Sequence, residues 1–563
     1  MARKLTSISW SLLALTLYLA TAIVLYGRSL IGHLSEVHAG QSSDPDLYIW
    51  FMTWWPYALS RHLNPFFTDL LWAPIGFNVA WSTSMPALSL LATPITHAQG
   101  PEVSFNLLSL ILPALSAWSG FILIRGIVKQ PGPALLGGYL FGFSPFMAAV
   151  QYAGHIFLTA IFLIPAAILL FWAQVEKRIS ALSFVLLFAI TLVAQFLISM
   201  EIFATALTFG VIALVLALIC WPKERERLVA AAIDAGVAIV CAVVILSPYL
   251  FYMLRASGIG MNPFWAGTAS SDLVEFIVPT RVMMIGQLAP MRAVAIHYVY
   301  DSYPWDSGAY TSLPLLVIVA IFLKSRWSQP LGRFLALLTM IVIVAMLGRH
   351  LRIDGHSVAK LPWLVIGALP FINSAVTARF AIYYHLLLAV AVALWMAEAK
   401  VSRALKIVVA ASIVFLQLPN LNSGFWSHPV EVPAFFESGE YRTKLNEGES
   451  VLVLPYGKGE SMLWQVHSGM YFAMPEGWTG PVPPAFQTLP IVRAFQRNAE
   501  IPDLGAQLKG FLTSHQIKTI LIDPAFPRAQ FWVAQLQALG GTVETSGGVI
   551  LVRMPYSDSA ASG

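Results

Sequence analysis

Residues 44–57 read Asp-Pro-Asp-Leu-Tyr-Ile-Trp-Phe-Met-Thr-Trp-Trp-Pro-Tyr and lie just beyond the first hydrophobic segment of the chain. Two acids, Asp44 and Asp46, flank a proline that stiffens the backbone and can present both carboxylates to one site. The aromatic run that follows favours the boundary between lipid and water. The stretch therefore predicts two carboxylates at a membrane surface, where an enzyme with a lipid-borne substrate needs a base or cation ligands.

The composition of the whole chain indicates a membrane protein. Of its 563 residues 58% are hydrophobic and only 11% are charged, and the mean hydropathy is +0.72. These values exclude a soluble protein of this length. Both cysteines, Cys220 and Cys241, lie in apolar runs, so we expect neither a disulfide framework nor a cysteine metal site. The net charge of +5 comes from basic residues that separate the apolar runs, and we expect no nucleic-acid partner.

The apolar runs predict about eleven transmembrane helices, because a spanning helix needs about 20 apolar residues. The segment 361–372 is shorter and rich in Pro and Gly, and we interpret it as re-entrant or interfacial. The predicted spans are 8–31, 103–126, 133–151, 155–174, 180–199, 202–221, 229–254, 309–323, 332–348, 378–397 and 405–421.

Basic residues predict how the chain is oriented, since the short loops that carry them stay on the cytoplasmic side. Arg3 and Lys4 precede the first span, and a basic cluster follows every even-numbered span. The amino terminus is then cytoplasmic, and the long loops 32–102, 255–308 and 349–377 face outward. The first span is too long for a cleaved signal peptide, and no small-residue cleavage site follows it. We expect a multi-pass protein of the bacterial cytoplasmic (inner) membrane.

The last part of the chain differs from the rest in composition. Charged residues return after residue 421, and the β-rich runs 451–454, 519–522 and 548–552 alternate with helix-like segments. The linker Pro419–Gly424 breaks the preceding helix. We therefore predict a membrane domain over 1–421 and a small extracytoplasmic α/β domain over 422–563.

Several polar side chains are candidates for chemistry. Asp44 and Asp46 can deprotonate a hydroxyl or hold a divalent cation, although Asp46 could instead cap the following helix. Asp272, Glu275 and Arg281 lie in the aromatic-rich loop 255–308, which suits sugar and phosphate recognition or a position on the membrane surface.

Three further candidates lie close to the outer membrane face. His155 and Glu201 each follow a tight turn between spans. Ionisable groups there usually face a bundle interior or a watery cavity, although a single His often has a structural role. Arg379 opens the tenth predicted span, where a guanidinium can bind a substrate phosphate or extend to lipid phosphates.

These features together resemble membrane glycosyltransferases of the GT-C fold class. The resemblance rests on a first span, an acid-bearing outer loop with an aromatic helix, further spans with short loops and a terminal outward α/β domain. Residues 44–50, 63–66, 74–78, 142–145 and 154–155 are similar to segments of bacterial members of that class. The resemblance covers the first seven spans best.

The resemblance implies a polyprenyl-phosphate sugar as donor and a hydroxyl acceptor, with transfer of a hexose or pentose on the outer face. It implies that Asp44 or Asp46 is the general base, and that basic residues, first Arg379 and then Arg281, stabilise the departing lipid phosphate. His155, Glu201, Asp272 and Glu275 are the other candidate substrate-binding residues. A divalent cation on Asp44 and Asp46 is possible, because Asp-Pro-Asp resembles the Asp-x-Asp of nucleotide-sugar enzymes.

Two other functions fit a multi-pass chain. A transporter or flippase of lipid-linked sugars is expected to have two related halves with broken spans and charges near the bilayer midplane. The sequence has neither, since its ionisable residues cluster near one face. A non-catalytic scaffold of an envelope-polysaccharide assembly would not need the acids and Arg379 to converge on one pocket.

Overall fold

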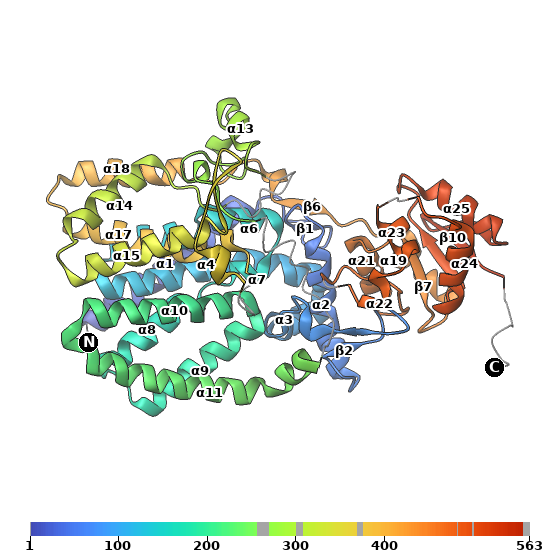
Figure 1. Ribbon diagram of the computed structural model, residues 1–563, viewed down its shortest axis with the longest axis horizontal. Coiled ribbons are helices and arrows are strands. Elements are labelled where there is room, and N and C mark those ends of the chain that lie inside the picture. Colours follow the sequence, from blue (N-terminus) through green and yellow to red (C-terminus); the bar gives the residue numbers. More distant parts are fainter. Residues whose placement is uncertain are drawn as a thin grey trace. The chain divides into compact units, whose positions relative to one another are not determined.

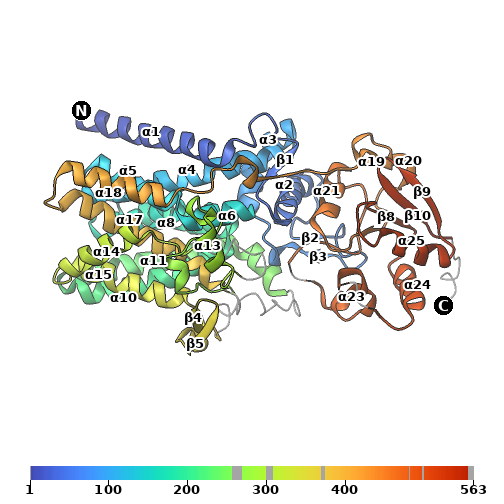
Figure 2. The same ribbon diagram turned by 90° about the horizontal axis from the view of Figure 1, so that it is seen from above.

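The computed structural model describes residues 2–255, 269–299, 308–368, 375–480, 482–497 and 500–555 (Figure 1, Figure 2). They form two compact units. The first comprises the described residues of Met1–Ser42, Phe105–Leu246 and Asn262–His428, and the second those of Ser43–Ser104, Ser247–Met261 and Pro429–Gly563. The loop with the acid pair is thus in the same unit as the terminal α/β segment, and the predicted boundary at residue 421 stays a prediction.

The first unit is a helical bundle. Strand β6 (Ser427–Pro429) pairs with β1 (Val37–Ala39), and β4 (His350–Ile353) and β5 (His356–Lys360) form a hairpin. Two of its helices are shared with the second unit: residues up to Ser104 of α4 and residues from Ser247 of α11 belong to that unit. The helices are α1 (Ala2–Ala22), η1 (Ile23–Gly27), α4 (Pro101–Val128), α5 (Pro131–Gly142), α6 (Pro145–Ala153), α7 (Ile156–Thr159), α8 (Leu163–Val175), α9 (Ala181–Ile198), α10 (Met200–Cys220), η3 (Pro222–Glu224), α11 (Arg225–Arg255), η4 (Val274–Phe276), η5 (Ile285–Gln287), α13 (Ala289–Ala295), α14 (Leu313–Ser325), α15 (Pro330–Met346), α16 (Trp363–Ile366), η7 (Thr377–Phe380), α17 (Ala381–Glu398), α18 (Arg403–Leu416) and η8 (Ser423–Phe425).

Eight helical segments of the described residues are long and apolar enough to cross a membrane. Two more apolar helices, α14 and α15, are shorter, and α18 has 14 residues. Every predicted span is therefore helical, and the predicted α-helical polytopic membrane fold is confirmed. The eight segments are Ile8–Gly27, Pro101–Val128, Pro131–Ala153, Ile156–Val175, Ala181–Ile198, Met200–Cys220, Pro222–Arg255 and Thr377–Glu398.

Two predicted segments differ in detail from the structure. Helix α14 begins at Leu313 rather than 309, since Pro314 in its first turn lacks a main-chain N–H and favours a helix start. The predicted re-entrant segment 361–372 contains the short helix α16, and its residues 369–372 lie outside the described part of the chain.

Helix α17 is the core of the first unit. Every residue from Ala381 to Leu394 is buried, because the helix is apolar on all sides and packs against α5, α14 and α15. Small residues bring the neighbouring helices close. A Cβ on Gly142 of α5 would overlap the backbone of Ala117 in α4, so this helix contact requires glycine.

The second unit contains the acid-bearing segment. It begins with α2 (Asp44–Ser60), followed by β2 (Phe67–Thr68), β3 (Phe77–Asn78), η2 (Val79–Trp81) and α3 (Pro86–Gln99). Strand-like pairing of Leu71 with Met474 joins this segment to the terminal one. The main-chain N–H of Ala73 also donates to the carbonyl of Met474 at 2.9 Å. Residues that are some 400 positions apart therefore fold together.

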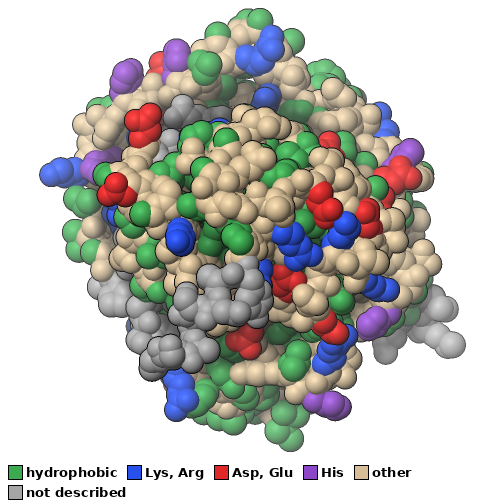
Figure 3. All heavy atoms as spheres, turned by 90° about the vertical axis from the view of Figure 1, so that its right-hand side faces the viewer, with side chains coloured by type: hydrophobic (Ala, Val, Ile, Leu, Met, Phe, Trp, Pro, Cys, Tyr) green, Lys and Arg blue, Asp and Glu red, His purple; other side chains and the backbone are tan. Residues whose placement is uncertain are grey.

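The terminal segment of this unit is built on a four-stranded sheet of order β7-β8-β10-β9. Strands β7 and β8 are parallel and the other pairs are antiparallel, which confirms the three predicted β-rich runs. Figure 3 shows one face of this unit with acidic and basic side chains interspersed. The elements are α19 (Ala434–Glu437), α20 (Tyr441–Lys444), β7 (Val451–Leu454), α21 (Gly459–His467), α22 (Pro484–Gln487), α23 (Pro490–Arg497), α24 (Leu504–Ser514), β8 (Thr519–Ile522), α25 (Ala529–Ala538), β9 (Thr542–Ser546) and β10 (Val549–Arg553).

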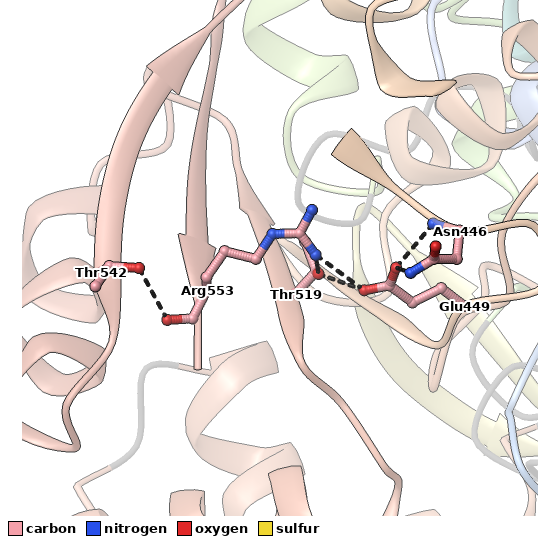
Figure 4. Close-up of polar contacts among 5 residues, drawn as sticks. All are labelled: Asn446, Glu449, Thr519, Thr542 and Arg553. Atoms are coloured by element: carbon pink, nitrogen blue, oxygen red, sulfur yellow. Dashed lines mark hydrogen bonds and ion pairs between the residues drawn. The ribbon is translucent and has the colours of Figure 1, made fainter. Parts of the chain in front are cut away.

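A polar group at one end of the sheet joins three of its segments (Figure 4). Arg553 of β10 lies 3.3 Å from the carboxylate of Glu449, which also accepts from the hydroxyl of Thr519 in β8. The main-chain N–H of Asn446 donates to the other oxygen of Glu449 at 2.9 Å. The Glu449 carboxylate therefore accepts from the segment before β7, from β8 and from β10.

We predict that Gly142→Ala destabilises the protein, although Gly→Ala changes in helices usually stabilise. The added methyl group would enter the space of Ala117, and overpacking of this kind costs about 1–3 kcal/mol. Gly132→Ala in the same helix is the matched control, because open space surrounds that position. Thermal melting in detergent should show a lower midpoint for Gly142→Ala alone. Equal midpoints would contradict the close contact between α4 and α5.

Candidate active site

The acid pair forms the first turn of α2. The helix begins at Asp44 with Pro45 next to it, so Asp46 lies inside the helix and does not cap it as one interpretation of the sequence expects. Both carboxylates are near the helix N-terminus, where the helix dipole favours negative charge. Asp44 is half-buried and Asp46 is only 4% exposed. Two acids that are two residues apart thus have different environments.

The aromatic run after the acids lies inside the second unit. Trp50, Trp54 and Trp55 are almost fully buried. Their indole N–H groups donate to Gln465, to the carbonyl of Pro65 and to the carbonyl of Ser84. These rings therefore contact protein rather than lipid, and the position of α2 relative to the membrane stays a prediction. Local sequence could not reveal the partners that bury them, because Gln465 belongs to the terminal segment.

Two residues of the terminal segment contact the acids. The indole N–H of Trp478 donates to Oδ1 of Asp44 at 2.9 Å. Gly459, the first residue of α21, lies against Asp46, and a Cβ there would overlap Oδ2 of Asp46. The positions of both carboxylates therefore depend on a part of the chain that is more than 400 residues away in sequence.

Further acids lie close to the pair. Glu102, at the start of α4, is 4% exposed, and its Oε1 is 3.0 Å from Nε2 of His467. Burial raises the pKa of Asp46 well above its ordinary value, and the charges of Glu460, Asp44 and Glu102 raise it further. Asp46 thus favours its protonated form, whereas Asp44 receives a hydrogen bond of the kind that stabilises a carboxylate.

The sequence prediction missed five residues of this site. They come from α4 and from the loop and helix after β7, and they are Glu102, Gly459, Glu460, His467 and Trp478. The stretch Gly457-Lys458-Gly459 between β7 and α21 was a possible signal, because a glycine-rich turn between a strand and a helix allows close approach.

A divalent cation is the other ligand considered for the acids. Among the described residues, no three His, Cys, Asp or Glu side chains are arranged to hold a metal ion. Cation binding by Asp44 and Asp46 stays a prediction, and no chemical step is derived through it.

In the first unit, Glu201 and Arg379 form an ion pair. Nη1 of Arg379 is 2.5 Å from Oε2 of Glu201, and their side chains are only 17% and 24% exposed, respectively. The hydroxyl of Ser199 accepts from the N–H of Ile202 at 3.3 Å and so caps α10, which positions Glu201 in the first helical turn. Two separately predicted residues are thus brought together.

Arg281 and His155 lie at a second position in the same unit. Nη2 of Arg281 donates to the hydroxyl of Tyr152 at 2.7 Å, and its guanidinium lies 5.5 Å from the centre of that ring. Tyr152 belongs to the last turn of α6, and His155 follows the left-handed Gly154 that ends this helix. His155 is 3% exposed. The structure thus places these two predicted residues around the end of α6.

Asp272 and Glu275 bind main-chain groups of the loops between the helices of the first unit. Asp272 accepts from the N–H of Val274 at 2.8 Å and from the N–H groups of Asp354 and Gly355 in the β4–β5 turn at 3.0 and 2.8 Å. Glu275 accepts from the N–H of Ala309 at 2.7 Å, and its burial raises its pKa to about 8. Both carboxylates thus have structural hydrogen-bond partners in the loops of this unit. A substrate-binding role for Asp272 and Glu275 stays a prediction.

Comparison with known proteins identifies the fold. The family described as a domain of unknown function (DUF6311) matches residues 13–422. No curated protein matches the sequence. The structure is similar to that of the arabinofuranosyltransferase AftD from Mycobacteria, with a TM-score of 0.58 and 13% identity over 98% of this chain and 42% of that chain.

A second similar structure is the oligosaccharyltransferase of Archaeoglobus fulgidus, tethered with an acceptor peptide that contains the NVT sequon. Its TM-score is 0.52 at 11% identity, over 91% of this chain and 69% of that chain. Both structures have the GT-C fold, so the predicted GT-C fold class is confirmed. At these identities the similarity shows the fold, and the activity has to be argued from the site.

We predict that Asp46→Asn changes how stability depends on pH. The folded protein holds a proton on Asp46 that the unfolded chain releases above its ordinary pKa of 3.8. The protonated Asp46 therefore contributes to the free energy of unfolding at low pH. This contribution is lost as the pH rises towards the pKa of Asp46 in the folded protein, by up to about 1.4 kcal/mol per pH unit. The melting temperature of Asp46→Asn relative to wild type should increase between about pH 5 and pH 8. Asp69→Asn, at an exposed acid of the same unit, should show a constant difference.

A second prediction concerns the Glu201–Arg379 pair. Arg379→Gln leaves a half-buried carboxylate without its cation, so this variant should melt lower than the double variant Arg379→Gln/Glu201→Gln. The double-mutant cycle should give a coupling of about 1–3 kcal/mol. The more exposed pair Lys444–Glu544 is the control, with an expected coupling below about 1 kcal/mol. Equal couplings would show that the burial of the first pair has no energetic effect.

Proposed function

The chain belongs to the family described as a domain of unknown function (DUF6311), and we propose that it is a membrane glycosyltransferase. The proposed reaction moves a sugar from a polyprenyl-phosphate donor to an acceptor hydroxyl on the outer face of the bacterial cytoplasmic membrane. The observation that carries this proposal is an acid pair that opens α2, directly after the first span of a GT-C fold.

The environments of the two acids support Asp44 as the general base. A base at neutral pH has to be ionised, and the indole N–H bound to Asp44 favours its carboxylate form. Asp44 is also the more accessible of the two, which an acceptor hydroxyl requires. Asp46 is buried among other acids and favours the neutral form, so it suits hydrogen bonding better than proton abstraction.

The proposed step is a single displacement. Asp44 takes the proton of the acceptor hydroxyl as its oxygen attacks the anomeric carbon. The bond between that carbon and the phosphate oxygen breaks, and its electron pair remains on the polyprenyl phosphate that leaves. Attack from the side opposite the leaving group inverts the configuration of the anomeric carbon. The proton then passes from Asp44 to solvent.

A leaving lipid phosphate needs a cationic partner, and Arg379 is our first choice. Its guanidinium is held at the start of the span Thr377–Glu398 by Glu201, so it loses little side-chain freedom when it binds an anion. A planar guanidinium can also bind a phosphate with parallel hydrogen bonds. Arg281, supported by Tyr152, is the second choice.

The experiment follows release of polyprenyl phosphate by the purified protein in phosphatidylethanolamine and phosphatidylglycerol vesicles. It supplies a panel of polyprenyl-phosphate sugars that covers common hexoses and pentoses, together with membrane extract as acceptor. We predict that Asp44→Asn lowers the rate by at least about 10²-fold, because the acceptor loses its base. Asp46→Asn should reduce it less, and Asp69→Asn should leave it unchanged.

Two outcomes would contradict the proposal. An unchanged rate in Asp44→Asn would exclude this acid as the base. Movement of the intact lipid-linked sugar across the vesicle membrane without release of polyprenyl phosphate would indicate a transporter instead. Thermal melting of each variant distinguishes loss of chemistry from loss of fold.

A further inference from the structure

The terminal α/β segment is fixed against the acid-bearing segment within the second unit. Helix α21 packs on α2, and Trp50 of α2 donates to Oε1 of Gln465 in α21 at 2.6 Å. The amide nitrogen of Gln465 donates in turn to the carbonyls of Leu70 and Phe472 at 3.0 and 2.7 Å. Gln465 has no exposed surface, so this network fixes the two helices with respect to each other.

The main chain around Trp478 is held by two contacts with the rest of the second unit. Its main-chain N–H points to the sulfur of Met462 in α21 at 3.3 Å. The next residue, Thr479, accepts from the indole of Trp72 at 3.0 Å and is itself 2% exposed. These contacts hold the main chain on which the indole of Trp478 is carried, and the indole itself donates to Asp44.

The space around Gly459 is filled by the acid segment. Oδ2 and Cβ of Asp46 and the carbonyl oxygen of Ser43 occupy the volume that a side chain on Gly459 would take. Its backbone dihedral φ is not in the left-handed region, so conformational strain does not require glycine here. Close approach of α21 to the start of α2 is the remaining reason for glycine at this position.

We propose that the terminal α/β segment forms part of the acid site. In this site the indole of Trp478 orients the carboxylate of Asp44, and Gly459, which has no side chain, leaves space for the carboxyl group of Asp46. Both are positioning residues that act through the acids. The inference rests on the proposed function, since it takes Asp44 as the base. It gives the terminal segment a role in chemistry that is separate from any binding of acceptor.

The first test is Trp478→Phe, which keeps an aromatic ring and removes the indole N–H. Loss of a hydrogen bond to a charged group should lower kcat about 10-fold or more and leave KM for the polyprenyl-phosphate sugar unchanged. The acidic limb of the pH profile should move to higher pH, because the carboxylate loses its donor. Trp81→Phe is the control, since that half-buried indole donates to the carbonyl of Met253 in the same unit.

The second test is Gly459→Ala, with Gly510→Ala in α24 as the control. A methyl group on Gly459 would displace Asp46, whereas open space surrounds Gly510. Gly459→Ala should lower the rate about 10-fold or more, as loss of a well-placed interaction does. It should also reduce the effect of Asp46→Asn on the pH dependence of melting, a readout that does not need activity.

The outcomes separate this inference from the proposed function. If Asp44→Asn abolishes transfer while Trp478→Phe keeps the wild-type pH profile and Gly459→Ala keeps the wild-type rate, the inference is wrong and the proposed function stands. If Asp44→Asn keeps the wild-type rate, the proposed function fails first. A shifted pH profile in Trp478→Phe with an unshifted one in Trp81→Phe supports the inference.

Discussion

Burying a carboxyl group away from water costs free energy, and the second unit buries several carboxyl groups within one region. Asp46, Glu102 and Glu476 are each at most 4% exposed. Neighbouring donors reduce the cost: His467 faces Glu102, and the N–H of Gly457 donates to Glu476. These acids lie in the second unit, in α2, at the start of α4 and in the loop after α21. Glu476 has its donor within the terminal segment, whereas Glu102 of the acid-bearing segment depends on His467 of the terminal one.

The acids of the first unit have different partners. Asp272 and Glu275 accept hydrogen bonds from main-chain N–H groups, and Glu201 has the guanidinium of Arg379. Each of these carboxylates thus has a donor of its own, as is usual for buried polar groups. In the second unit, in contrast, burial raises the pKa of Asp46, and the charges of neighbouring carboxyl groups raise it further. A raised pKa alone does not separate the two units, because burial also raises the pKa of Glu275 in the first unit. The second unit differs in that several other carboxyl groups lie near Asp46.

The sequence predicted the parts of the fold that local pattern determines. The spans follow from runs of apolar residues, and β7, β8 and β10 follow from short β-rich runs between turns. The same local reasoning could not show that protein buries the aromatic run of α2. A buried tryptophan and an interfacial one look alike in sequence, and only the distant Gln465 shows which of the two Trp50 is. Trp478 and Gly459 escaped prediction for the same reason, since their significance depends on contacts across more than 400 residues.

The two acids of the Asp-Pro-Asp motif are two residues apart in a helix, so they point in different directions from its axis. Asp44 meets the indole of Trp478, and Asp46 meets the start of α21. The first environment supplies a hydrogen-bond donor to the Asp44 carboxylate, whereas burial and the nearby acids raise the pKa of Asp46. A pair divided in this way can take a proton at one position and donate a hydrogen bond at the other. That difference between the two acids comes from their contacts with the terminal segment of the same unit.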